Sequence, residues 1–352
     1  MSELYYSRIK WKRNSTFYNK FVMLKGMSSS TPPMLNNIFD TEEFVGGGFY
    51  FNWQGYGVVI DPGYYFIKNL HRMGLSVLDI DAVVITHEHI DHNNDMRLLD
   101  DLHYSVARYS KQNGKAHVID WYMDKVSYDI ALTWRRNGAG LNAKANNLHC
   151  LASDVEYEFK VDELFLETCP TKHIWNPSAG RYRDHTVGTK FRCRSGAGET
   201  VIVYTSDTRY YPELADFVRD ADAVIANISG IYEEDYKLVK EKNTHLGYYG
   251  CFNLMKECFE RHQRYPSFYF LSEFWNGKSD IRYDVAKCLR KDLNAQKITQ
   301  IRVIPAEVGM IFDIEHCKIQ CSRCGAFTDR VIVKKPGGMK EKVEVLCPEC
   351  CF

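Results

Sequence analysis

One seven-residue segment constrains this chain more than any other feature. Residues 86–92 read THEHIDH and follow four apolar residues that predict a short buried strand. His87 and His89 are two residues apart, so in an extended backbone their imidazoles point to the same side and can bind one metal ion. Asp91 and His92 stand where the chain is expected to turn, within reach of a second ion. Such ligands suit zinc, or manganese and iron where carboxylates dominate.

This segment resembles the signature motif of the metallo-β-lactamase superfamily, and supporting motifs extend the resemblance over roughly residues 20–310. Members of the superfamily have an α/β fold, an αββα sandwich with one or two metals at the sheet edges. The resemblance implies a hydrolase domain of this fold over residues 21–312, preceded by an N-terminal extension over residues 1–20. It identifies the superfamily far better than the substrate, because one fold can host many reactions.

The resemblance also assigns roles to residues outside the first motif. Asp61 ends a predicted strand and is expected to orient the metal-binding loop by hydrogen bonding without binding metal itself. Asp207 follows another predicted strand and matches the carboxylate that bridges two metals. The third histidine ligand is expected between two strands, where His173 is favoured and His185 is the alternative.

One further residue resembles the pattern of the ribonuclease Z-like branch, and another departs from it. His245 precedes a predicted helix, as does a histidine that such enzymes use beside the metals, and a helix N-terminus also favours an anionic phosphate. Glu273 stands where these relatives usually carry a metal-binding histidine. It could bind zinc or manganese, or it could leave the second site weak. The implied catalytic residues are Asp91 and His245. The implied ligands of two divalent metals are His87, His89, Asp91, His92, His173, Asp207 and Glu273.

The C-terminal residues 313–352 differ in composition from the rest of the chain. Two Cys-x-x-Cys pairs are separated by 22 residues, a spacing that can close a tetrahedral structural zinc site. A segment this small lacks the core to fold otherwise. The sequence therefore predicts a zinc ribbon, with Cys317 and Cys351 as substitutes for one ligand. The predicted ligands are Cys321, Cys324, Cys347 and Cys350.

Composition limits the partners and the cellular location. The 45 basic and 45 acidic residues give a net charge of zero, so no overall basic field attracts long nucleic acids. No apolar run is long enough to cross a membrane, and the first twenty residues do not resemble a signal peptide. We therefore expect a cytoplasmic protein with reduced cysteines and without a membrane partner.

The resemblance implies that two adjacent metals activate a bound hydroxide for attack on the substrate. His245 and a small-residue loop over residues 26–33 favour the phosphodiesterase branch. Only 37 residues separate Asp207 from His245, too few for the insertion of ribonuclease J-like nucleases. A cyclic nucleotide is then as credible a substrate as RNA, and relatives of this kind suggest a homodimer. The alternatives are a lactonase-type hydrolase, or a module that binds nucleic acid or protein with a degenerate metal site.

Overall fold

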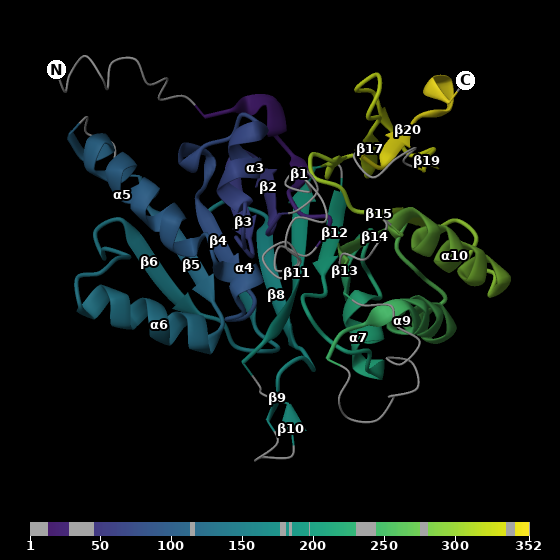
Figure 1. Cartoon of the computed structure of the whole chain (residues 1–352), viewed down its shortest axis with the longest axis horizontal. Helices are drawn as coiled ribbons and strands as arrows, with labels where there is room; N and C mark the ends of the chain where they lie inside the picture. The colour runs from purple at the N-terminus through teal and green to yellow at the C-terminus, as the bar shows by residue number, and fades with distance from the viewer. Residues whose placement is uncertain are drawn as a thin grey trace.

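The structure is a computed structural model that describes residues 13–27, 46–112, 117–176, 181–182, 185–196, 198–229, 244–274, 281–335 and 342–351. Within these residues, two β-sheets pack face to face and helices cover their outer faces (Figure 1). This is the predicted αββα sandwich. Most of the small-residue loop expected over residues 26–33, and the first twelve residues of the N-terminal extension, lie outside the described residues.

The first sheet contains nine strands in the order β18-β17-β16-β1-β2-β3-β4-β5-β6. Neighbouring strands are antiparallel from β18 to β3 and parallel from β3 to β6. The strands are β1 (Lys20–Met23), β2 (Phe49–Trp53), β3 (Tyr56–Ile60), β4 (Ala82–Ile85), β5 (Ile119–Met123), β6 (Asn146–Cys150), β16 (Ile311–Asp313), β17 (Lys318–Gln320) and β18 (Phe327–Thr328).

The second sheet contains seven strands in the order β15-β14-β13-β12-β11-β8-β7. The strands from β12 to β15 are parallel, and those from β7 to β12 are antiparallel. They are β7 (Glu156–Glu158), β8 (Leu164–Pro170), β11 (Val187–Ser195), β12 (Gly198–Tyr204), β13 (Ala223–Ser229), β14 (Phe268–Phe274) and β15 (Arg302–Pro305). A separate short hairpin joins β9 (Trp175–Asn176) to β10 (Arg181–Tyr182).

Helices bury the outer face of each sheet in its own apolar cluster (Figure 1). Those on the first sheet are α3 (Phe66–Arg72), α5 (Met96–Gln112) and α6 (Lys125–Arg136), with the single turn α4 (Ile90–Asn93) after β4. Those on the second sheet are α7 (Pro212–Val218), α9 (Gly247–His262) and α10 (Arg282–Ala295). None of the helices in the described part of the chain has the length and apolarity that crossing a bilayer requires. Short 3-10 turns are η1 (Ser15–Phe17), η2 (Val77–Asp79) and η3 (Pro348–Cys350).

Aromatic side chains join the two sheets across the central core. In β2, successive side chains point to opposite faces, so Phe49 and Phe51 enter the space between the sheets while Tyr50 packs on the helix side. The rings of Phe51 and Phe191 meet edge to face with centroids 4.8 Å apart. Those of Phe49 and Tyr204 lie 5.1 Å apart in the same arrangement. Edge-to-face pairs stabilise the contact beyond simple burial, and they hold strands of the two sheets in a fixed relation.

The cysteine-rich C-terminal segment continues the first sheet. Its first strand, β17, pairs with β16, and β18 pairs with β17. β19 (Ile332–Lys334) and β20 (Glu344–Leu346) form a separate hairpin. Val343 and Val345 are buried in the core between the two sheets, so this segment shares the core of the sandwich. It starts beside the N-terminal end of β12, where Thr200 donates a 2.7 Å hydrogen bond to the Ile314 carbonyl.

Candidate metal centre

The histidines and carboxylates of the first motif gather where several strands end. β4 is fully buried and ends at Ile85, so the residues after it leave the sheet at its edge. Thr86 and His87 come next, and His89 is the N-cap of α4, whose first turn carries Asp91 and His92. Asp207 follows the end of β12, opposite the end where the C-terminal segment begins. The fold thus brings separate loops to one edge of the sandwich.

A single carboxylate oxygen lies at the centre of the cluster. Asp207 is buried, and its Oδ2 faces the Nε2 atoms of four imidazoles from three loops. Its Oδ1 accepts a 2.9 Å hydrogen bond from the Asn227 side chain, which fixes the carboxylate. The distances from Oδ2 to Nε2 are 3.9 Å for His87, 3.4 Å for His92, 3.7 Å for His173 and 3.3 Å for His245.

The side chains of His87, His89 and His173 form a compact set. The Nε2 of His173 lies 3.0 Å from Nδ1 of His89, and the three rings lie 4.8 to 4.9 Å apart between centroids. All three can offer a ligand nitrogen within 4.8 Å of one another. The buried Nε2 atoms of His87 and His92 have no hydrogen-bond partner in the described part of the chain. Buried polar atoms are rarely left unpaired, so this donor set fits a divalent cation.

Hydrogen bonds to the opposite nitrogens orient these rings. The Nδ1 of His173 donates to the Thr244 carbonyl over 2.9 Å, and the Nδ1 of His92 lies 2.7 Å from Asp61. In His173 this leaves the Nε2 lone pair directed at the cluster. Partners of this kind fix the tautomer of a histidine ligand and raise its basicity.

Asp61 is the centre of the supporting network. It accepts hydrogen bonds from the Thr86 N–H at 2.8 Å, the Thr86 hydroxyl at 2.7 Å and the Tyr204 hydroxyl at 3.0 Å, besides its contact with His92. Both oxygens of the Asp61 carboxylate are therefore engaged in hydrogen bonds within the protein, as expected for a residue that orients the metal-binding loop. Tyr204 and Asn227 were not singled out from the sequence, because nothing in their local pattern distinguishes them from other strand residues.

We expect Asp61→Asn to lower metal affinity about 10- to 100-fold, the usual loss when a residue that supports a ligand is changed. The backbone of Asp61 is left-handed, with φ of +49°, a conformation that asparagine also tolerates, so the variant should fold. The amide keeps the size of the carboxylate but removes its charge from His92. Metal affinity is measured by competition with a chromogenic chelator. Tyr204→Phe, which removes one neutral donor to Asp61, should have a smaller effect; equal affinities for Asp61→Asn and the wild type would contradict the role.

Burial and mutual charge set the protonation of the cluster. Burial, together with His92 and His173, holds the pKa of His87 well below its usual range, and burial lowers the pKa of His173 to about 4. Burial alone would raise the pKa of Asp207, but His92 and His245 hold it well below its usual range. Neutral imidazoles beside an ionised carboxylate are the forms that bind a metal.

Two of the predicted ligands have other partners. His185, the alternative to His173, lies outside the cluster: its Nε2 is 3.3 Å from Glu88 Oε2, and the two form a separate group with Asp124. Glu273 is buried and forms an ion pair with Lys25. Lys25 is a residue that the sequence reasoning missed. Its only signal was a lysine directly after an apolar strand, where a buried side chain is expected.

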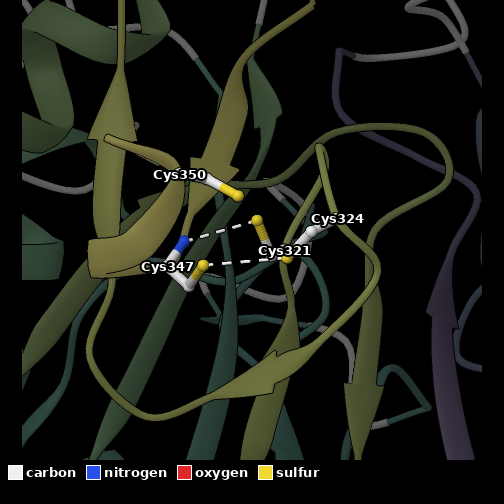
Figure 2. Close-up of side chains that lie close together, drawn as sticks. All are labelled: Cys321, Cys324, Cys347 and Cys350. Carbon is white, nitrogen blue, oxygen red and sulfur yellow. Dashed lines mark hydrogen bonds between the residues drawn. The ribbon is translucent and has the colours of Figure 1, made fainter. Parts of the chain in front are cut away.

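The four predicted zinc ligands of the C-terminal segment converge on one point (Figure 2). Cys324 Sγ lies 3.7 Å from Cys347 Sγ, and the Cys347 N–H points to Cys321 Sγ at 3.4 Å. Although burial opposes ionisation of Cys321, backbone N–H groups lower the pKa of its thiol to about 6, so the thiolate that zinc requires is favoured. The predicted substitutes are not part of this group: Cys317 contacts Thr200 and Ile314, and Cys351 is outside the four-cysteine cluster. The cluster fits a structural zinc site.

Comparisons with known proteins agree with this geometry. The sequence matches the family described as beta-lactamase superfamily domain over residues 56–264, more than half of the chain. A search of curated protein sequences found no match.

Three solved structures are similar over most of their length. The metallo-beta-lactamase fold protein YhfI from Bacillus subtilis is 17% identical with a TM-score of 0.58, covering 83% of this chain and 98% of that chain. The short form of human tRNase Z is 16% identical with a TM-score of 0.54, covering 84% and 99%. Unliganded yeast PDE1 is 11% identical with a TM-score of 0.59, covering 82% and 98%. At such identities these similarities establish the fold. The chain therefore belongs to the beta-lactamase superfamily and has the metallo-β-lactamase fold, with a C-terminal four-cysteine cluster that fits a zinc ribbon.

Proposed function

We propose that this hydrolase cleaves a phosphodiester bond in a nucleotide or a nucleic acid, with a cyclic nucleotide or RNA as the substrate. The observation that carries the proposal is the position of His245, whose Nε2 reaches the cluster from the start of α9, 3.3 Å from Asp207. A divalent cation, zinc or else manganese or iron, held by His87, His89, His173 and Asp207 would polarise the substrate and lower the pKa of water toward neutrality.

The N-terminus of α9, which follows His245, suits a phosphate group. Leu246 is the N-cap of α9 and its side chain makes no capping hydrogen bond, so the first N–H groups of the helix are not satisfied in that way. A helix N-terminus attracts anions. Two of the proteins with a similar fold, tRNase Z and PDE1, are phosphodiesterases.

In this proposal His245 donates a proton to the leaving group. Its side chain is 24% exposed and so is open to a substrate, while Asp207 and the neighbouring Thr244 hold its ring. Thr244 also accepts from His173, so the loop that carries His245 is tied to the metal ligands. An alkoxide that leaves a phosphodiester needs such a proton, and general acids of this kind typically contribute roughly 10²- to 10⁴-fold in rate.

We expect His245→Ala to lower kcat by roughly 10²- to 10⁴-fold for a cyclic nucleotide or a short RNA, whose leaving group is an alkoxide. For bis-p-nitrophenyl phosphate the loss should be much smaller, because a nitrophenolate leaves without a proton. Metal content, measured on the same samples, should not change. His262→Ala, at the other end of α9 and paired with Asp216, is the matched control. Equal losses on both kinds of substrate would contradict a proton-donating role.

The reaction class is tested with a panel of substrates. The chelated protein and samples reloaded with zinc or manganese are assayed on bis-p-nitrophenyl phosphate, a lactone and a β-lactam. Metal-dependent turnover of the phosphodiester alone is the expected result. Turnover of the lactone instead would favour a lactonase-type enzyme, and no turnover by any metal-loaded sample would favour a binding module. A homodimer, a cytoplasmic location and a catalytic and metal-binding role for Asp91 stay predictions.

A further inference from the structure

A buried lysine lies beside the metal centre. Lys25 follows β1 closely, and its side chain is 0% exposed although lysine is among the residues least often fully buried. Its Nζ forms an ion pair with Glu273, which is 1% exposed and has a left-handed backbone at φ of +62° near the end of β14. In the described part of the chain, neither group has a hydrogen-bond partner outside this pair. A buried charge requires compensation, so each of these residues depends on the other.

The sheet register brings this pair to the metal centre. The side chain of Asn227 donates to Asp207, and Asn227 is paired with Ser272 across β13 and β14. Glu273 is the next residue, so it emerges at the same edge of the sheet. A backbone hydrogen bond holds the segment of Lys25 at this edge. The Phe274 N–H, which follows Glu273, donates to the carbonyl of Gly26, which follows Lys25.

Lys25 is close enough to the carboxylates of Asp91, Asp207 and Asp61 to interact with them electrostatically. Burial lowers the pKa of Lys25, while the carboxylates of Asp91, Asp207 and Asp61 raise it. A second divalent cation, expected from the sequence on Asp91, His92, Asp207 and Glu273, would have to share this space with an ammonium ion.

We propose that the ion pair of Lys25 and Glu273 replaces the second metal of the site. The centre then binds one divalent cation on His87, His89 and His173 with Asp207, and Lys25 is a positioning residue that occupies the place of the second cation together with Glu273. Glu273 is committed to Lys25 and is not a ligand. The two residues belong together: a buried carboxylate at the position of a histidine ligand needs a positive partner, and Lys25 provides it. This inference rests on the proposed metal-dependent hydrolysis.

The test counts metals. The protein is saturated with zinc, freed of excess, and analysed by elemental analysis, and a thiol-reactive mercurial then releases the zinc that cysteines hold. The remainder belongs to the histidine centre. We expect one such metal per chain in the wild type and two in Lys25→Met/Glu273→His, which restores a histidine ligand without leaving an unpaired buried charge. Lys190→Met is the matched control, because Lys190 is also buried and pairs with Asp220 away from the site. It should keep one metal.

Each outcome decides between the two proposals. Two histidine-centre metals in the wild type would overturn the inference and leave the hydrolase proposal intact. One metal without phosphodiester turnover would support the inference and contradict the phosphodiesterase. No metal in the histidine centre would overturn both. If the double variant does not fold, cobalt-substituted wild type gives the answer: an exchange-coupled cobalt pair in its electron paramagnetic resonance spectrum would overturn the inference, and an isolated cobalt signal from the histidine centre would support it.

Discussion

Asp207→Ala is expected to empty the histidine centre and to lower phosphodiester turnover by at least roughly 10³-fold. Removing one hydrogen-bond donor to a transition state typically lowers kcat about 10²- to 10³-fold, and loss of a catalytic metal is expected to lower it further. The physical reason is the position of this carboxylate. Its Oδ2 lies within 3.9 Å of four imidazole nitrogens, and it is the acid that these rings share. Without it, a cation would meet neutral ligands alone in a buried site.

Metal content and kcat/KM are measured on the same samples of the wild type and Asp207→Ala. The control is Asp216→Ala, which removes a carboxylate paired with Arg261 and His262 at the surface, where ion pairs contribute little. The ribbon zinc should remain in both variants. Full turnover by Asp207→Ala, or loss of turnover with the metal still bound, would show that Asp207 is not the residue on which the centre depends.

Cys347→Ser is expected to unfold the ribbon and destabilise the whole sandwich. Binding of a structural zinc contributes about 10 to 16 kcal/mol of apparent free energy in small zinc domains, far more than a segment of this size gains from its own core. Val343 and Val345 would then leave the core between the sheets. Exposing two such side chains costs about 3 to 6 kcal/mol, at about 1.5 to 3 kcal/mol each.

Zinc content, thermal denaturation and limited proteolysis of residues 314–351 report these effects. Cys351→Ser provides a close control, because Cys351 is exposed and lies outside the four-cysteine cluster. It should keep the zinc, the melting temperature and the protease resistance of the wild type. A Cys347→Ser protein with the same zinc content and melting temperature as the wild type would mean that the four cysteines do not hold a structural metal.

Local patterns in the sequence were sufficient for much of the fold and part of the site. The spacing of His87 and His89 behind a buried strand depends only on neighbouring residues, and the structure places both in one cluster. The strands predicted before Asp61, His87 and Asp207 are β3, β4 and β12 in the structure. The paired cysteines converge, because each Cys-x-x-Cys turn places two thiols together whatever surrounds it.

The choice between His173 and His185 depended on tertiary structure. Both lie between β8 and β11, and the pairing of Pro170 with Val187 brings the two ends of that connection together. The direction in which each chain then leaves the sheet sends His173 toward Asp207 and His185 toward Glu88. No local pattern encodes this direction, since it follows from how the second sheet packs against the first.

The sequence by itself determined the superfamily, predicted the first metal ligands and identified the four-cysteine cluster, because each rests on residues close together in the chain. Only the tertiary structure paired Lys25 with Glu273, because the two residues are far apart in the sequence. Their contact exists because β1 and β14 belong to different sheets whose ends meet at one edge, where Met27 bridges to Phe274. A contact between distant segments depends on the register and packing of whole sheets, and a reading of neighbouring residues does not contain that information.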